Sequence, residues 1–160
     1  MSNALGRFQP GEIEALTSYL YDSSLKMNCW LRGERWMGEQ TQQSIKLATA
    51  ALSKLPCYEG VVYRGANLDQ SIIEQYRPGE IVIEKAFTST TKTPTIAMYF
   101  AEGGDIPTIF LIDSKQGRLT EGVRKFNVEE EVLFAPNTSF LVLGRQVKDG
   151  LTWTYMQEVR

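Results

Sequence analysis

The 160-residue sequence contains no histidine and only two cysteines. Without histidine there can be no Ser-His-Asp triad, no Cys-His pair, no His-ligated zinc site and no histidine general base. Cys29 and Cys57 cannot build a four-ligand zinc site, and one disulfide would be a sparse framework for a secreted fold. We therefore expect two buried free thiols. Any catalysis has to use carboxylates, hydroxyls, arginine, lysine or thiols.

The sequence also lacks an excess of either charge and any long apolar run. Its 17 basic and 19 acidic residues give a net charge of -2, which provides no general attraction to nucleic acid or to an anionic membrane. No segment approaches the roughly 20 apolar residues of a membrane-spanning helix. Residues 1–11 lack the apolar core of a Sec signal peptide. We expect no nucleic-acid or membrane partner, and export would need another route or a longer parent chain.

Helical patterns fill the first third of the sequence, about residues 10–55. Pro10 can open a helix, and apolar residues then recur at helical spacing as far as position 20. A short helix over 24–31 and a longer one from Glu39, stopped before Pro56, follow the same pattern.

The rest of the chain, about residues 59–160, consists of short apolar runs typical of strands. They cover residues 61–63, 81–83, 108–112, 132–134, 140–147 and 151–159. Asp149-Gly150 predicts a hairpin between the last two. Thr93-Pro94 predicts the cap and first turn of one short helix that ends near residue 101. Helices first and strands later, with no linker or repeat between them, favour a single α+β domain over 1–160.

Three short clusters place polar side chains beside these apolar runs, and the first is Tyr63-Arg64-Gly65. An arginine at the end of a strand can point into a cleft and form paired hydrogen bonds with a phosphate or a carboxylate. A glycine after it lets a ligand approach the backbone closely. The alternative is an arginine at a sheet edge in a surface salt bridge.

The second cluster is Ser89-Thr90-Thr91, which follows Phe87 and Thr88. Four consecutive hydroxyls after an aromatic residue suit a strand that lines a polar pocket, where they could orient a carboxylate or a ligand amide. The alternative is the ordinary strand propensity of threonine, combined with a cap for the next helix.

The third cluster is Glu129-Glu130-Glu131, which runs directly into the apolar residues 132–134. Three adjacent acids repel one another and usually mark a solvated loop. If Glu131 begins the strand, however, the two-residue period places Glu129 and Glu131 on one face and Glu130 on the other. Two carboxylates on one face can divide their work, one at a sugar and one at an acceptor.

Taken in this order, Arg64, Ser89-Thr90-Thr91 and Glu129-Glu130-Glu131 resemble the R-S-E pattern of bacterial mono-ADP-ribosyltransferase toxins. The E-x-E pair resembles that of the family members associated with arginine acceptors. Thr91 stands where serine is commoner in the family, which should matter little because the family places the main role on the first hydroxyl, here Ser89.

The resemblance extends over nearly the whole chain. Residues 19–32, which end in Asn28-Cys29-Trp30-Leu31-Arg32, are similar to the family's N-terminal helix. Residues 61–65 are similar to its first strand motif, and residues 131–136 to its catalytic strand and the following turn. The implied fold is α+β: N-terminal helices packed on two small, mainly antiparallel β-sheets that form an NAD cleft.

The resemblance also implies roles for the motif residues. Glu131 would hydrogen-bond a ribose hydroxyl and stabilise the positive charge of an oxocarbenium-like transition state. Ser89 would hold Glu131 in position and help bind nicotinamide. Arg64 would anchor the ribose or a phosphate of NAD, the Gly65 backbone could bond the carboxamide, and Thr90 belongs to the same cofactor-binding group. The scheme needs no metal.

Two further residues would recognise the acceptor. Glu129 would hydrogen-bond the incoming guanidinium and help it lose a proton, which an arginine does not do unaided. Residues 117–128 resemble the family's acceptor-recognition loop, in which Phe126 has the position of an aromatic target contact. The alternative for Phe126 is a loop aromatic packed on the core.

The resemblance therefore implies an NAD-dependent mono-ADP-ribosyltransferase toxin or effector that modifies an arginine of a target protein and releases nicotinamide. The alternatives are an NAD glycohydrolase, in which water is the acceptor, and a catalytically silent NAD- or protein-binding module. Such a toxin would act in the cytoplasm of a target cell, after non-Sec secretion or delivery within a larger protein. If the target is bacterial, an immunity protein that blocks the cleft is an expected partner.

Overall fold

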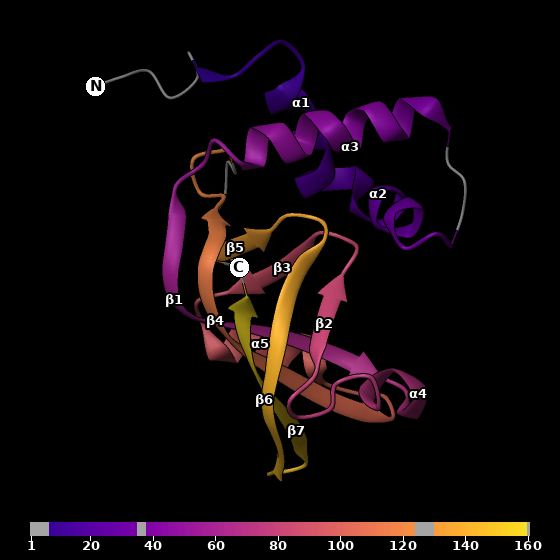
Figure 1. The fold of residues 1–160 in the computed structure, drawn as a ribbon, viewed down its shortest axis with the longest axis vertical. Coiled ribbons are helices and arrows are strands. Elements are labelled where there is room, and N and C mark those ends of the chain that lie inside the picture. The colour runs from indigo at the N-terminus through magenta and orange to yellow at the C-terminus, as the bar shows by residue number, and fades with distance from the viewer. Residues whose placement is uncertain (1–6, 35–37, 124–129, 160) are drawn as a thin grey trace.

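The computed structural model describes residues 7–34, 38–123 and 130–159. Three helices gather in a layer at one end of the molecule, above the strands in Figure 1. They are α1 (Glu12–Ser18), α2 (Ser24–Leu31) and α3 (Glu39–Leu52), and a π-helical turn over Tyr19–Ser23 joins the first two. Two further helices, α4 (Gln70–Ile73) and α5 (Pro94–Ala101), lie within the strand-rich part of the chain. The predicted order of helices before strands is confirmed.

Helix α3 shows how the sequence builds this layer. Its buried residues Thr41, Ile45, Ala48 and Leu52 recur every three or four positions, so that one stripe faces the interior. The helix ends at Leu52, shortly before Pro56, which disfavours a helical conformation in the residue before it. No helix in the described ranges combines the length and apolar character needed to cross a lipid bilayer.

The described residues form seven strands: β1 (Cys57–Leu68), β2 (Ile81–Glu84), β3 (Thr88–Thr91), β4 (Ile106–Leu119), β5 (Glu131–Phe134), β6 (Thr138–Lys148) and β7 (Leu151–Val159). Hydrogen bonds join them in the order β1-β3-β5-β4-β7-β6-β2, and β1 also pairs with β4. All these pairings are antiparallel except that of β4 with β7. The expected α+β fold with mainly antiparallel strands is confirmed.

The long strands β1 and β4 are shared by two parts of this hydrogen-bonded network. At one end, β3 and β5 continue it, with Tyr63 paired to Thr91 and Arg118 paired to Leu133. Elsewhere, residues 108–113 of β4 pair with β7, and β6 and then β2 extend the sheet from β7. The two expected sheets are thus two parts of one connected sheet.

The helical layer covers the part of the sheet that contains β3 and β5. Leu16 of α1 and Ala48 and Leu52 of α3 lie in one buried cluster with Phe87 and Leu133. Phe87 immediately precedes β3, and Leu133 lies in β5. Apolar burial therefore holds the N-terminal helices against the two short strands that carry the predicted polar clusters.

Two expectations differ from the structure. Strands β1 and β4 are longer than their apolar runs, because polar flanking residues also join the ladder. The expectation of two buried thiols is wrong: Cys57 is exposed and Cys29 is half-buried. Cys57 is the first residue of β1, in the extension that the apolar pattern did not show.

Candidate active site

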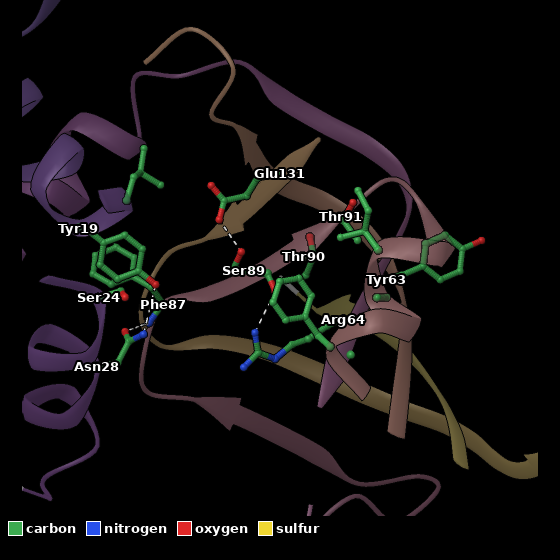
Figure 2. A pocket seen from close by; sticks show the side chains of 15 residues that line it. Tyr19, Ser24, Asn28, Tyr63, Arg64, Phe87, Ser89, Thr90, Thr91 and Glu131 are labelled. Atoms are coloured by element: carbon green, nitrogen blue, oxygen red, sulfur yellow. Dashed lines mark hydrogen bonds between the residues drawn. The ribbon is translucent and has the colours of Figure 1, made fainter. Parts of the chain in front are cut away.

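A cavity of about 370 Å³ lies between the helical layer and strands β1, β3 and β5 (Figure 2). Its lining includes all five residues predicted to bind the cofactor, namely Arg64, Gly65, Ser89, Thr90 and Glu131. These residues come from three strands that are far apart in the sequence and adjacent in the sheet. The structure therefore brings the first and second clusters together with the last residue of the third.

Glu131 is the first residue of β5 and is only 3% exposed. The hydroxyl of Ser89 donates a hydrogen bond to its Oε2 atom (Figure 2). The hydroxyl of Thr120 donates to its Oε1 atom at 2.8 Å. Donors on both oxygens compensate part of the cost of burying a carboxylate, and they fix its orientation at the cavity wall.

Arg64 lies in β1 and faces the same cavity. Its Nη1 atom donates a hydrogen bond of 2.9 Å to the backbone carbonyl oxygen of Ser89. No Asp or Glu among the described residues forms an ion pair with it. The guanidinium is thus held by one neutral contact and presents its positive charge to the cavity, which suits an anionic group such as a phosphate.

The hydroxyls of β3 have different partners. Ser89 reaches Glu131, whereas the buried Thr90 donates to the backbone carbonyl of Val132 at 2.6 Å. The hydroxyl of Thr91 accepts a hydrogen bond of 3.1 Å from the backbone N–H of Thr93. Thr90 lines the cavity, but its hydroxyl binds the neighbouring strand.

The helical wall of the cavity contains a second hydrogen-bonded pair, Tyr19 and Asn28. The Asn28 side chain donates to the Tyr19 hydroxyl at 3.2 Å and accepts from the backbone N–H of Phe87 at 3.1 Å. The rings of Tyr19 and Phe87 lie 4.5 Å apart. Burial raises the pKa of Tyr19 above its usual value, and the negative charge of Glu131 contributes to the same shift. The Tyr19 hydroxyl therefore stays protonated at neutral pH.

Gly65 has a packing role that the sequence did not indicate. A Cβ atom at this position would lie 1.7 Å from the backbone carbonyl oxygen of Ala97 in α5. The absence of a side chain therefore lets α5 approach β1 and form one wall of the cavity. Gly65 also lines the cavity, and its contact with a ligand through the backbone stays a prediction.

Phe126 and Glu129, the two predicted acceptor residues, lie outside the described residues. Glu130 has a φ of 45°, and its carboxylate accepts a hydrogen bond from the Thr93 hydroxyl. Thr93 is the N-cap residue of α5, as predicted, but its hydroxyl makes this contact instead of capping the helix. Glu130 is therefore not extended, and the extended conformation of β5 begins at Glu131.

Sequence reasoning missed three residues of this arrangement. Tyr19 and Asn28 lie within residues 19–32, which resemble the family's N-terminal helix, but no role was predicted for either. Thr120 lies within residues 117–128, the predicted acceptor-recognition loop, and no contact with Glu131 was predicted for it. Thr120 follows the mostly polar residues 113–119, beyond the apolar run over 108–112, so no local pattern distinguishes it. Its contact with Glu131 becomes visible only once the pairing of β4 with β5 is known.

The ADP-ribosyltransferase exoenzyme family model matches residues 2–157 of this chain. The Mav protein of Mycobacterium avium (strain 104) is 38% identical over 136 residues, which are 85% of this chain and 16% of Mav. The NAD(+)–protein-arginine ADP-ribosyltransferase Tre1 of Serratia proteamaculans (strain 568) is 32% identical over 134 residues, which are 83% of this chain and 28% of Tre1. The chain thus spans less than a third of either relative.

Solved structures show the same fold. The Vis toxin, an ADP-ribosyltransferase from Vibrio splendidus, superposes with a TM-score of 0.86 at 26% identity, over 99% of this chain and 77% of Vis. A structure of Vis in complex with agmatine superposes with a TM-score of 0.84 at 27% identity, over 96% of this chain and 76% of that one. Agmatine carries the same guanidinium group as arginine.

Proposed function

Because this chain belongs to the ADP-ribosyltransferase exoenzyme family, we propose that it transfers ADP-ribose from NAD to an arginine side chain of a target protein and releases nicotinamide. The observation that carries this proposal is the chain of direct contacts from Arg64 through Ser89 to Glu131 on one cavity wall. It brings one positive and one negative side chain to the same cavity, which supports a contact of the first with a phosphate and of the second with a sugar. On this proposal, residues 1–160 form one catalytic domain.

The reaction begins at the bond between C1′ of the ribose and the ring nitrogen of nicotinamide. When this bond breaks, its electron pair goes to nicotinamide, and positive charge develops on the ribose. Glu131 is proposed to stabilise that charge and to hydrogen-bond a ribose hydroxyl. Ser89 holds Glu131, and its position supports a contact with nicotinamide. These assignments rest on the burial of Glu131 and on its two hydroxyl donors.

Arg64 is proposed to bind a phosphate or the ribose of NAD, because its guanidinium faces the cavity without an ion-pair partner among the described residues. The backbone of Gly65 is proposed to bond the carboxamide of nicotinamide, and Thr90 completes the cofactor-binding group. Tyr19 can donate its hydroxyl proton into the same cavity, since that oxygen already accepts from Asn28.

The second half of the reaction needs a nucleophilic nitrogen. A guanidinium nitrogen attacks C1′, a new C–N bond forms, and the guanidinium loses one proton. Glu129 is proposed to hydrogen-bond the guanidinium and to take part in this proton loss, and Phe126 is proposed to contact the target protein. The family resemblance of the E-x-E motif supports the first role, and the agmatine complex of Vis supports a guanidinium acceptor.

Partners and location follow from this reaction as proposals. The protein partner is a target whose arginine is modified in the cytoplasm of another cell, reached by a non-Sec route or as part of a longer chain. An enzyme that modifies cytoplasmic proteins endangers its producer when the target is bacterial, so an immunity protein that blocks the cavity is a further proposed partner. Co-purification with the product of an adjacent reading frame would test it, and absence of any such complex would count against it.

The function is tested by incubating the purified chain with labelled NAD and agmatine. ADP-ribosyl-agmatine together with free nicotinamide supports the transferase, whereas free ADP-ribose alone identifies an NAD glycohydrolase. Binding of NAD without release of nicotinamide identifies a silent binding module. Putrescine, which lacks the guanidinium group, is the matched control acceptor and should not be modified.

A further inference from the structure

The carboxylate of Glu131 is held by two hydroxyls, and the family motif accounts for only one of them. Ser89 binds the Oε2 atom, while Thr120 donates to the Oε1 atom at 2.8 Å. We propose that Thr120 is a positioning residue for the transfer reaction and that its hydroxyl fixes the orientation of the Glu131 carboxylate. This inference rests on the proposed function, because it assigns Thr120 a part in the same site.

The backbone places Thr120 beside Glu131. Thr120 directly follows β4, where Leu119 pairs with Val132 of β5. Its N–H lies 3.4 Å from the carbonyl oxygen of Glu131, and its own carbonyl accepts a hydrogen bond of 3.0 Å from Val123. Its contact with Glu131 is therefore built into the pairing of two strands and the turn that follows.

Burial shows why a hydroxyl at this position matters. Thr120 is 0% exposed, and it is not among the described residues that line the cavity. It therefore cannot bind NAD directly and can influence the reaction only through Glu131. Valine would fill nearly the same space without the cost of burying a polar group. The threonine hydroxyl is thus explained by its donation to the carboxylate.

Two donors on different oxygens restrain the carboxylate more than one donor does. The terminal torsion of a glutamate side chain is broad when it is not restrained. Ser89 restrains the Oε2 atom, and Thr120 adds a restraint on the Oε1 atom. A carboxylate already oriented toward the place where positive charge develops needs no reorganisation during the reaction.

The test compares Thr120→Val, which removes the hydroxyl, with Thr120→Ser, which keeps it. Thr154→Val is the matched control, because Thr154 is also 0% exposed but its hydroxyl has no hydrogen-bond partner among the described residues. We expect Thr120→Val to lower kcat for ADP-ribosyl transfer from NAD to agmatine by about 10- to 100-fold, because a hydrogen bond to a charged group is lost. The KM for NAD should change by less than about twofold, since Arg64 and the cavity are intact. Thr120→Ser should restore most of kcat, and Thr154→Val should leave it unchanged.

The inference is overturned if Thr120→Val keeps the kcat of the original chain, or if Thr120→Ser loses as much as Thr120→Val. If Thr120→Val does not fold, Thr120→Ala gives the same comparison. Failure of the proposed function would appear separately, as absence of nicotinamide release by the unsubstituted chain. A crystal structure of Thr120→Val then decides without activity: we expect a rotated or split Glu131 carboxylate, and an unchanged one would refute the role of Thr120.

Discussion

The hydroxyl of Ser89 donates a hydrogen bond to the carboxylate of Glu131, although 42 positions separate the two residues in the sequence. Neighbouring strands make this contact possible, because β3 and β5 pair antiparallel along their whole length. The backbone carbonyl of the same serine accepts from Arg64 on the adjacent strand. One residue therefore connects the cationic and anionic sides of the site.

Replacing Glu131 with glutamine should abolish both ADP-ribosyl transfer and NAD hydrolysis. The amide has nearly the same shape but no negative charge, so it cannot stabilise a developing oxocarbenium ion. We expect the rate of nicotinamide release to fall by at least about 100-fold. Nicotinamide release is measured with and without agmatine, and retention of full activity would refute the assigned role.

Replacing Glu129 with glutamine should separate the two activities. If Glu129 handles the guanidinium and not the ribose, transfer to agmatine should fall by about 100-fold or more while some hydrolysis of NAD remains. The ratio of ADP-ribosyl-agmatine to free ADP-ribose is the measurement. An unchanged ratio would show that Glu129 has no special role at the acceptor.

Replacing Gly65 with alanine should destabilise the fold. The new Cβ atom would meet the carbonyl oxygen of Ala97 at 1.7 Å, so that α5 or β1 has to shift. We expect a loss of about 1–3 kcal/mol in the free energy of unfolding, measured by denaturant titration. Gly144→Ala is the control, because a Cβ there meets no atom within 4 Å. Equal effects of the two substitutions would contradict the packing role of Gly65.

Replacing Thr154 with valine should stabilise the protein. The Thr154 side chain is fully buried, and its hydroxyl has no hydrogen-bond partner among the described residues. Removing an unsatisfied hydroxyl from the interior should raise the free energy of unfolding by about 1 kcal/mol. Thermal unfolding monitored by circular dichroism measures the change, and a lower Tm would contradict this prediction.

The sequence predicted the parts of this structure that depend on local pattern or on motif order. Arg64 and Glu131 could be predicted as site residues, because a glycine follows the first and two further acids precede the second. Contacts between strands were not, since they depend on register: Thr120 reaches Glu131 only through the pairing of β4 with β5. The packing of Gly65 against α5 was not predicted, because nothing in a linear pattern shows that α5 returns to pack on β1.

The most direct test of this account is mass spectrometry of agmatine after incubation with NAD, with the purified chain and its Glu131→Gln variant side by side. We expect the unsubstituted chain to add one ADP-ribosyl group to the guanidinium and the variant to add none. Agmatine left unmodified by the unsubstituted chain, or modified equally by the variant, would contradict it.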